Sequence, residues 1–489
     1  MAELDEKPFP PGEYPAVVIG SGPGGLQASY CLERLRVEHA VLSRDETPGG
    51  MFRSFPIYQR LLSWTKPDAP FPPGTREYEW YDHNSLLGEE PEHQAAIVPF
   101  MDRSYMVPSR PEMEQGLASF AKKAGVRVRY GCTWESARRA SDGALVLTTS
   151  VGEYRCRTAV FALGVTEPWK SPIPGIEDVP HYADARKPHE YQGKRVFVIG
   201  KRNSGFELAD GLLPWAQQVF LGSPRPVDTS VIALSSVRVR YLQPYEDAGL
   251  GGGTFALDVA LERIERTGDR YRILGAGTTR EGPLDLEVDE VIAATGFSTP
   301  LLDLTDCGVH TVAQGRIPAM TPYWESEAGS GIYFAGNATQ GAAGLKKNGV
   351  GASSPAVQGF RYNARVMTRQ LAEMHLGMKV QRPKVPGGRD ELISYLLHEA
   401  CHAPELWAQK SYLASAVYET GETEIVPLSH FLDHAAHGAV AIAVEMNAEG
   451  SIYPAVYTAK GGGEEHLLPP HHLNDFQGDE YRRELQSLL

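Results

Sequence analysis

The sequence lacks the features that would assign it to several common protein classes. Its five cysteines are scattered through 489 residues, without a Cys-x-x-Cys pair or a zinc-ligand cluster. We therefore expect neither a disulfide framework nor a dithiol relay. Nowhere do about 18 apolar residues follow one another, and the first residues contain no basic and apolar leader, so we expect a cytoplasmic protein without a membrane span.

Positive charge is scarce as well. The chain carries 47 Lys and Arg against 61 Asp and Glu, a formal net charge of −14. Nucleic-acid affinity comes largely from cationic side chains, so nucleic acid is not an expected partner. Glycine is plentiful, with 50 residues, and the hydrophobic fraction of 42% is that of a globular enzyme. A chain of this length predicts two or three domains.

Two short apolar runs are each followed by a glycine loop and then by a helical pattern. Residues 16–19 and residues 196–199 precede the loops Gly20-Ser21-Gly22-Pro23-Gly24-Gly25 and Gly200-Lys201-Arg202-Asn203-Ser204-Gly205. Strand, tight glycine turn and helix are typical of a dinucleotide site, where a pyrophosphate meets the helix N-terminus. The loops lie too far apart for one unit of about 30 residues, so each should open its own doubly wound domain.

Further motifs follow the first loop in a fixed order. They are Pro48-Gly49-Gly50-Met51-Phe52, Ala294-Thr295-Gly296-Phe297 and the run Gly331-Ile332-Tyr333-Phe334-Ala335-Gly336-Asn337. Over residues 15 to 375 the set resembles the flavin-containing monooxygenase and thioredoxin-reductase-like superfamily. Residues 59–62, 82–87, 203–207 and 358–362 more narrowly resemble the group of the endoplasmic-reticulum flavoprotein associated with degradation and its bacterial relatives.

The resemblance implies an FAD site at the first loop. The implied FAD-binding residues are Gly20, Ser21, Gly22, Pro23, Gly24, Gly25, Ser43, Arg44, Gly50, Met51, Gly336 and Asn337. Two of them depart from the family pattern. Ser43 stands where an acidic ribose ligand is usual, and Asn337 stands where the family carries Asp, so the site is less negative than its relatives' sites.

The second loop should bind the nicotinamide nucleotide. The implied residues are Gly200, Lys201, Arg202, Asn203, Ser204, Gly205, Ser223, Arg225, Thr295 and Gly296. Arg202 replaces the second glycine, so its guanidinium either pairs with the phosphates or blocks them. Residues 222–225, directly after the strand at 218–221, contain no acid to hold a free ribose hydroxyl. Arg225 is placed to hold a 2′-phosphate, which favours NADPH over NADH.

The predicted fold is α/β, with two doubly wound Rossmann-like dinucleotide-binding domains, the NADPH domain inserted in the FAD domain. We expect the FAD domain to cover residues 1–165 and 289–378, and the NAD(P)H domain to cover residues 166–288. Residues 379–489 should form a small α+β appendage, with a strand pair at 439–446 and 452–458 around a turn at 447–450.

Without a dithiol, electrons must leave the flavin by another route. We expect reduced flavin to react with O₂ to a C4a-peroxide that oxygenates a small-molecule substrate at nitrogen, sulfur or a carbonyl. Lys66 is the candidate catalytic residue, unless it is simply a solvated lysine. The alternatives are an NAD(P)H-dependent flavin oxidoreductase without oxygen insertion, or a flavin-stabilised binding protein with an inactive nicotinamide site.

One motif points to different chemistry. His398-Glu399-Ala400-Cys401-His402 has the His-Glu-x-x-His spacing of zinc proteases. Apolar residues at 392, 393, 396 and 397 instead favour a packed helix that Pro404 ends. We therefore expect no metal site.

Overall fold

The computed structural model describes residues 7–58, 60–105, 107–227, 253–344, 347, 351–447, 449–459 and 464–489. The chain divides into two compact units, each built from segments that are distant in the sequence. The first unit contains Met1–Arg53, Ser63–Val165 and Thr299–Leu489, and the second contains Ser54–Leu62 and Thr166–Ser298. The fold is the predicted α/β type with Rossmann-like sheets.

A seven-stranded sheet forms the centre of the first unit. Its order is β3-β2-β1-β6-β5-β4, and β17 pairs with the last residues of β6, on the same side as β5. The strands are β1 (Gly12–Ile19), β2 (His39–Ser43), β3 (Arg129–Tyr130), β4 (Trp134–Arg139), β5 (Leu145–Thr149), β6 (Gly152–Phe161) and β17 (Ile332–Phe334). Residues 16–19 and all of β2 are buried, as expected for parallel strands covered on both faces.

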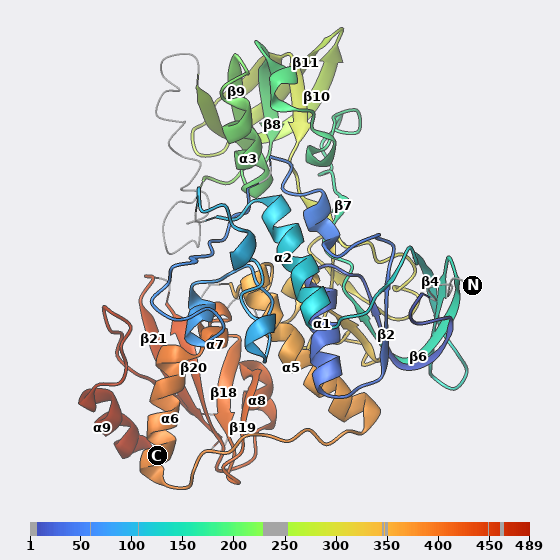
Figure 1. The fold of residues 1–489 in the computed structure, drawn as a ribbon. Coiled ribbons are helices and arrows are strands. Elements are labelled where there is room, and N and C mark those ends of the chain that lie inside the picture. Colours follow the sequence, from blue (N-terminus) through green and yellow to red (C-terminus); the bar gives the residue numbers. More distant parts are fainter. Residues whose placement is uncertain are drawn as a thin grey trace. The chain divides into compact units, whose positions relative to one another are not determined.

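Four helices of the first unit lie next to the ends of its strands or to one another. Helix α1 (Pro23–Arg34) follows β1 directly, and α5 (Val357–Leu376) packs against it along much of its length (Figure 1). Helix α2 (Arg110–Lys123) begins with a capping box between Ser109 and Glu112. A 3₁₀ helix, η8 (Gly336–Gly341), directly follows β17.

The last part of the first unit is a five-stranded antiparallel sheet of order β19-β18-β20-β21-β22 with four helices. Its elements are α6 (Arg389–His402), α7 (Pro404–Ala408), β18 (Leu413–Val417), β19 (Thr423–Pro427), α8 (Leu428–His434), β20 (Val440–Met446), β21 (Ile452–Thr458), β22 (Glu464–Leu467) and α9 (Asp479–Leu488). The predicted strand pair at 439–446 and 452–458 is confirmed by the pairing of β20 with β21.

The second unit has its own six-stranded sheet, of order β12-β11-β10-β9-β8-β13. Its elements are β8 (Arg195–Ile199), α3 (Asn203–Leu212), β9 (Gln218–Ser223), β10 (Thr254–Thr267), β11 (Arg270–Gly277), β12 (Pro283–Val288) and β13 (Glu290–Ala293). Strands β9 and β13 lie parallel to β8, and β10 continues the parallel order before it pairs antiparallel with β11. The strand–loop–helix order of β8 and α3 repeats that of β1 and α1.

The division into units differs from the predicted boundaries at three places. Ser54–Leu62, predicted within the FAD domain, belongs to the second unit. The sequence predicts a return to the first unit at residue 289, whereas the structure places it at Thr299. The reason is that β13 still pairs with β8, and β14 (Phe297–Ser298) still pairs with β7 (Glu167–Pro168). Residues 379–489 also cluster with the first unit. No helix in the described ranges is long and apolar enough to cross a membrane.

Candidate functional site

The first glycine loop is shaped by close backbone approaches. Gly20 has φ of +113°, and a β-carbon there would lie 2.4 Å from the carbonyl oxygen of Ala162. A β-carbon on Gly25 would lie 2.0 Å from the carbonyl oxygen of Gly20. Only glycine fits these two positions. Gly22 is the N-cap of α1 and no side chain caps the helix, so its first N–H groups are left for an anionic group.

The end of β2 meets this loop through a pair of hydroxyl groups. The Oγ atoms of Ser21 and Ser43 lie 2.8 Å apart, and both residues are buried. The Asp45 N–H also donates to the Ser43 Oγ, at 3.2 Å. Ser43 is thus part of a local network rather than a free replacement for an acidic ribose ligand. Arg44, the next predicted residue, is exposed.

The Gly336-Asn337 turn contacts the same loop, although it lies more than 300 residues later in the sequence. A β-carbon on Gly24 would lie 2.4 Å from the backbone N of Gly336, so the two backbones are in close contact. Asn337 donates from Nδ2 to the Met51 Sδ at 3.7 Å, and its Oδ1 accepts the Val165 N–H at 3.0 Å. The structure therefore brings together predicted residues from three separate motifs. Val165 is a site residue that no motif had indicated.

These residues fit the diphosphate of a dinucleotide. A β-carbon on Gly22 would lie 3.5 Å from the Cα of Gly50, an ordinary contact. Gly22 is therefore not needed for the packing of the protein itself, in contrast to Gly24 and Gly25. Its missing side chain leaves space beside the open N-terminus of α1, where a pyrophosphate would bind.

A buried polar network supports the Asn337 turn from behind. Asn363 on α5 donates from Nδ2 to the Oγ1 of Thr339 at 3.1 Å and to the Oγ of Ser354 at 3.0 Å. Gln409 donates from Nε2 to the Asn363 Oδ1 at 2.5 Å and to the Ser354 Oγ at 3.1 Å. All four side chains are at most 1% exposed. Residues of the C-terminal sheet region therefore hold the turn in place.

The strand that leads to this turn is held by Glu325. The carboxylate accepts the Gly331 N–H at 2.8 Å and the Tyr333 hydroxyl at 3.2 Å, and it pairs with His375 Nε2 at 3.0 Å. Burial opposes the charged form, but the hydrogen bonds from His375 and Gly331 outweigh it and lower the pKa of Glu325. Because the folded-state pKa is depressed, its stabilisation is present above the unfolded value of about 4.3 and is lost as the pH falls through the folded value.

Glu325→Gln should therefore lower stability by about 1–2 kcal/mol near neutral pH, because hydrogen bonds to a charged group are weakened. The difference from the wild type should shrink as the pH falls below about 4.3. Thermal unfolding followed over this pH range measures it. Glu327→Gln is the matched control, because Glu327 is exposed. A difference between Glu325→Gln and wild type that stays constant with pH would contradict the assigned role.

The second glycine loop resembles the first in its backbone, but it also carries two charged side chains, Lys201 and Arg202. Gly200 has φ of +124°, and the N-cap of α3 is Arg202, whose backbone is extended and whose side chain is exposed. The Lys201 side chain is buried, donates to the Leu257 carbonyl at 2.7 Å and pairs with Asp258. The Lys201 ammonium, predicted at the nucleotide, is therefore bound inside the sheet.

Asp258 is a charged residue of this region that the sequence patterns missed. It lies on β10 in register with Ser223, the last residue of β9. Burial opposes its ionisation, but hydrogen bonds from Lys201 and from Thr279 Oγ1, the latter at 2.7 Å, lower the pKa of Asp258. The register of neighbouring strands creates this pairing, and a local motif does not reveal it.

The other predicted nucleotide residues lie at strand ends of the second unit. Arg225 follows β9 and is exposed. Thr295 donates from Oγ1 to the Trp169 carbonyl at 2.5 Å, and the Gly296 carbonyl accepts from His181 Nε2 at 2.9 Å. Thr295 and Gly296 thus join the end of β13 to Trp169 and His181, in the segment that precedes β8.

Lys66 is in the environment of a solvated lysine. Its side chain is exposed, and the Nζ lies 5.6 Å from the ring centre of Trp64 and 5.9 Å from that of Tyr81. Such distances are typical of cation–π contacts. The contacts that fix the Lys66 side chain are thus to aromatic rings rather than to the glycine loops.

The His-Glu-x-x-His motif lies on α6, and its glutamate is already bound. Both Glu399 oxygens accept from Arg76, at 2.9 and 3.2 Å. The rings of His398 and His402 stack with centroids 4.6 Å apart. Within the part of the chain that the structure describes, no group of three or more His, Cys, Asp or Glu residues could hold a metal ion.

Known proteins resemble this chain in sequence and in fold. The family model described as pyridine nucleotide-disulphide oxidoreductase matches residues 17–336. An FAD-dependent oxidoreductase domain-containing protein 2 of Danio rerio is 30% identical over 295 residues, covering 56% of this chain and 42% of that protein. The indole-3-pyruvate monooxygenase YUCCA1 of Oryza sativa subsp. japonica is 27% identical over 201 residues, covering 40% and 44%. This chain thus spans less than half the length of these relatives.

A solved structure shares the fold. The bacillithiol disulfide reductase of Bacillus cereus superposes with a TM-score of 0.55 at 19% identity, covering 74% of this chain and 99% of that one. The part of this chain beyond the matched family model includes the C-terminal sheet with its helices.

Proposed function

Because the chain belongs to the pyridine nucleotide-disulphide oxidoreductase family, we propose that it is an NADPH-dependent flavin monooxygenase acting on a small molecule. It is a flavin-dependent oxidoreductase, with FAD and NADPH as cofactors. Bound FAD supplies the redox chemistry. The residues of the chain supply the binding, the orientation and the charge around it.

The first unit would hold FAD with its backbone. The N–H groups at the start of α1 would hold the diphosphate, because the helix dipole favours negative charge there. Asn337 Oδ1 accepts a hydrogen bond from the Val165 N–H. Because Asn337 is neutral, it would orient the turn without placing a negative charge beside the flavin. In the second unit, the exposed Arg202 and Arg225 would bind the phosphates of NADPH.

The cysteines are the reason for proposing a monooxygenase rather than a thiol reductase. All five are free, and no two stand in a Cys-x-x-Cys pair. Burial raises the pKa of Cys31, Cys307 and Cys401, and it raises the pKa of Cys156 to about 12. Thiol–disulfide exchange needs a thiolate. We therefore propose O₂ as the electron acceptor, with one oxygen atom transferred to the small substrate, which is oxidised, and the other released as water.

The deciding experiment follows both electrons and oxygen. The holoprotein is mixed with NADPH, isotopically labelled O₂ and a panel of amines, thioethers and ketones. Label in an organic product, with NADPH consumed in equal amount, is the expected result. NADPH consumption that yields only hydrogen peroxide or a reduced acceptor would instead select a flavin oxidoreductase. No consumption of NADPH would indicate an inactive nicotinamide site.

Arg225→Ala should weaken NADPH binding by about 10- to 100-fold and leave NADH binding almost unchanged. The reason is that a charge-assisted hydrogen bond to the 2′-phosphate is worth about 1.5–3 kcal/mol. Titration of the holoprotein with each nucleotide measures both affinities. Arg202→Ala is the matched comparison, because a contact to the shared pyrophosphate should weaken both nucleotides equally.

Two results would contradict these assignments. Equal loss of NADH and NADPH affinity in Arg225→Ala would remove it from the 2′-phosphate. Tighter binding of both nucleotides to Arg202→Gly would show that this side chain is an obstruction.

A further inference from the structure

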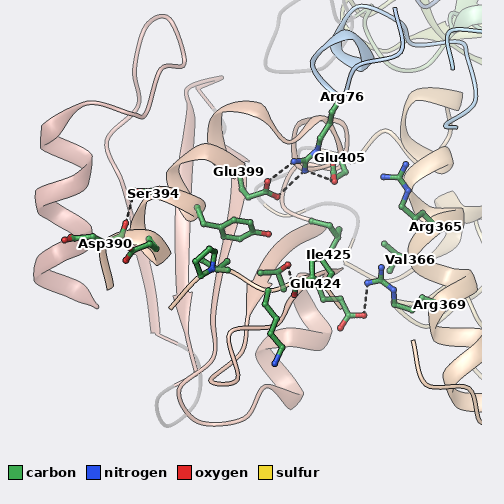
Figure 2. A pocket seen from close by; sticks show the side chains of 17 residues that line it. Arg76, Arg365, Val366, Arg369, Asp390, Ser394, Glu399, Glu405, Glu424 and Ile425 are labelled. Carbon is green, nitrogen blue, oxygen red and sulfur yellow. Dashed lines mark hydrogen bonds and ion pairs between the residues drawn. The ribbon is translucent and has the colours of Figure 1, made fainter. Parts of the chain in front are cut away.

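A cavity of about 670 Å³ lies in the first unit, and neither glycine loop contributes to its lining. Its walls come from α5, α6, the edge strand β19 and the segment before α6 (Figure 2). Val366, Tyr395, Val385 and Ile425 give it an apolar lining. Its volume is in the range of sites for small organic molecules, which are largely apolar with a few convergent polar groups.

Most charged groups of the cavity wall are paired with one another. Arg76 bonds to Glu399 and also to Glu405, at 3.0 Å. Arg369 donates to Glu424 at 3.3 Å, and Arg382 donates to the same carboxylate at 2.7 Å. The dashed lines of Figure 2 trace the pairs of Arg76 and of Arg369. These charges therefore have partners without any ligand.

Arg365 is different. It lies on α5 one turn before Arg369 and lines the cavity. Its backbone carbonyl accepts from Thr368 Oγ1, yet within the described ranges its side chain makes no hydrogen bond or ion pair. Burial opposes its charge, but the Glu79 and Glu405 carboxylates outweigh this and raise the pKa of Arg365. A charged guanidinium with five N–H donors thus lies on a partly apolar wall with its donors unused.

Helix α5 contributes residues both to this cavity and to the support of the Asn337 turn. Asn363 bonds to Thr339 in the turn that follows Gly336, whereas Arg365 and Val366 line the cavity. Residues two positions apart on a helix point to different faces. A molecule in the cavity would therefore contact a face of α5 other than the one that supports the Asn337 turn.

The two ends of the cavity differ in charge. Figure 2 shows Asp390 at the end opposite Arg365, and Glu391 lies next to it in the sequence. Both of these acidic residues are exposed at the start of α6. An anionic group would be repelled at that end and attracted at the α5 end. The polar group of a ligand is thus expected beside Arg365.

We propose that this cavity binds a small apolar carboxylic acid, with the carboxylate held by Arg365 and the apolar body against Val366 and Ile425. Planar guanidinium and carboxylate groups form two parallel hydrogen bonds, which makes arginine the side chain suited to this anchor. The site goes beyond the proposed flavin chemistry. It adds a second small-molecule site, between α5 and the elements α6 and β19 of the C-terminal sheet region.

The test uses the yellow holoprotein and calorimetric titration with naphthylacetate. We expect saturable binding of one molecule per chain. Naphthylacetamide has the same body without the charge, and it should bind about 10- to 100-fold more weakly, the worth of a charge-assisted hydrogen bond. Arg365→Met should weaken naphthylacetate by the same factor. Arg138→Met, an exposed arginine on β4, should leave the affinity unchanged.

A second variant guards against loss of folding in Arg365→Met. Val385→Trp places a large side chain into the cavity from its rim, without changing any charge, and should abolish binding while flavin content stays normal. No saturable binding of naphthylacetate below about 10 mM would overturn the proposal. Equal affinity of wild type and a folded Arg365→Met, or of acid and amide, would also overturn it. The flavin absorbance reports on the cofactor separately, so these results do not depend on the proposed oxygenation.

Discussion

Gly22→Val should give a folded protein that is colourless. The backbone of Gly22 has φ of −72° and ψ of 179°, which valine adopts readily. A β-carbon there makes only an ordinary contact to Gly50, at 3.5 Å. The valine methyl groups would fill the space beside the α1 N-terminus that the pyrophosphate requires. We expect FAD affinity to fall by about 100-fold or more, because either the diphosphate or the loop must move.

Flavin absorbance after incubation with excess FAD, together with the far-ultraviolet circular dichroism spectrum, measures this result. Gly387→Val is the matched control, since nothing lies within 4 Å of a β-carbon at that exposed position. Gly24→Val would be uninformative, because its β-carbon would collide with the Gly336 backbone and disturb the fold itself. A fully yellow Gly22→Val protein would place the flavin elsewhere.

Arg76→Met should cost about 3–5 kcal/mol of the free energy of unfolding. Arg76 is the bonding partner of both Glu399 and Glu405, whose side chains are only 4% and 6% exposed. Removing one partner of a buried ion pair leaves an uncompensated buried charge. The Arg76 side chain is itself 40% exposed, so the lower end of the range is expected. Urea unfolding at neutral pH measures the loss.

Two further variants identify the cause. Arg103→Met breaks a pair with Asp68 that is exposed on both sides, and it should change stability by less than about 1 kcal/mol. Adding Glu399→Gln and Glu405→Gln to Arg76→Met should recover part of the loss, because neither buried carboxylate is then left charged without its arginine. An equal effect of Arg76→Met and Arg103→Met would contradict the buried-pair explanation.

Much of the backbone arrangement of the candidate flavin site could be predicted because its information is local, whereas the binding of FAD by these residues stays a prediction. The spacing of Gly20, Gly22 and Gly25 follows from one turn of backbone, and the structure shows the close approach at two of these three residues. The order of the motifs also indicated that Met51 and Asn337 belong to the same site. The hydrogen bond between them agrees with that expectation.

The interactions that were missed depend on contacts between distant segments. Lys201 looks like a phosphate ligand in its own loop, but the register of β9 and β10 places Asp258 beside it. The network of Asn363 and Gln409 joins helix α5 to a residue far along the chain. No periodicity or motif marks such pairs, because strand register and helix packing arise only in the folded protein.

The Gln409 network has a consequence for the synthesis of the protein. The flavin loop begins at Gly20, yet the turn at Asn337 is held through Asn363 by Gln409, so the complete site spans most of the chain. Chains emerge from the ribosome from the N-terminus and fold in units, and contacts of high sequence separation form late. The second unit, which consists of Ser54–Leu62 and Thr166–Ser298, can complete its sheet before β17 of the first unit has been synthesised. A nascent chain should therefore acquire its cofactor only after Gln409 has left the exit tunnel.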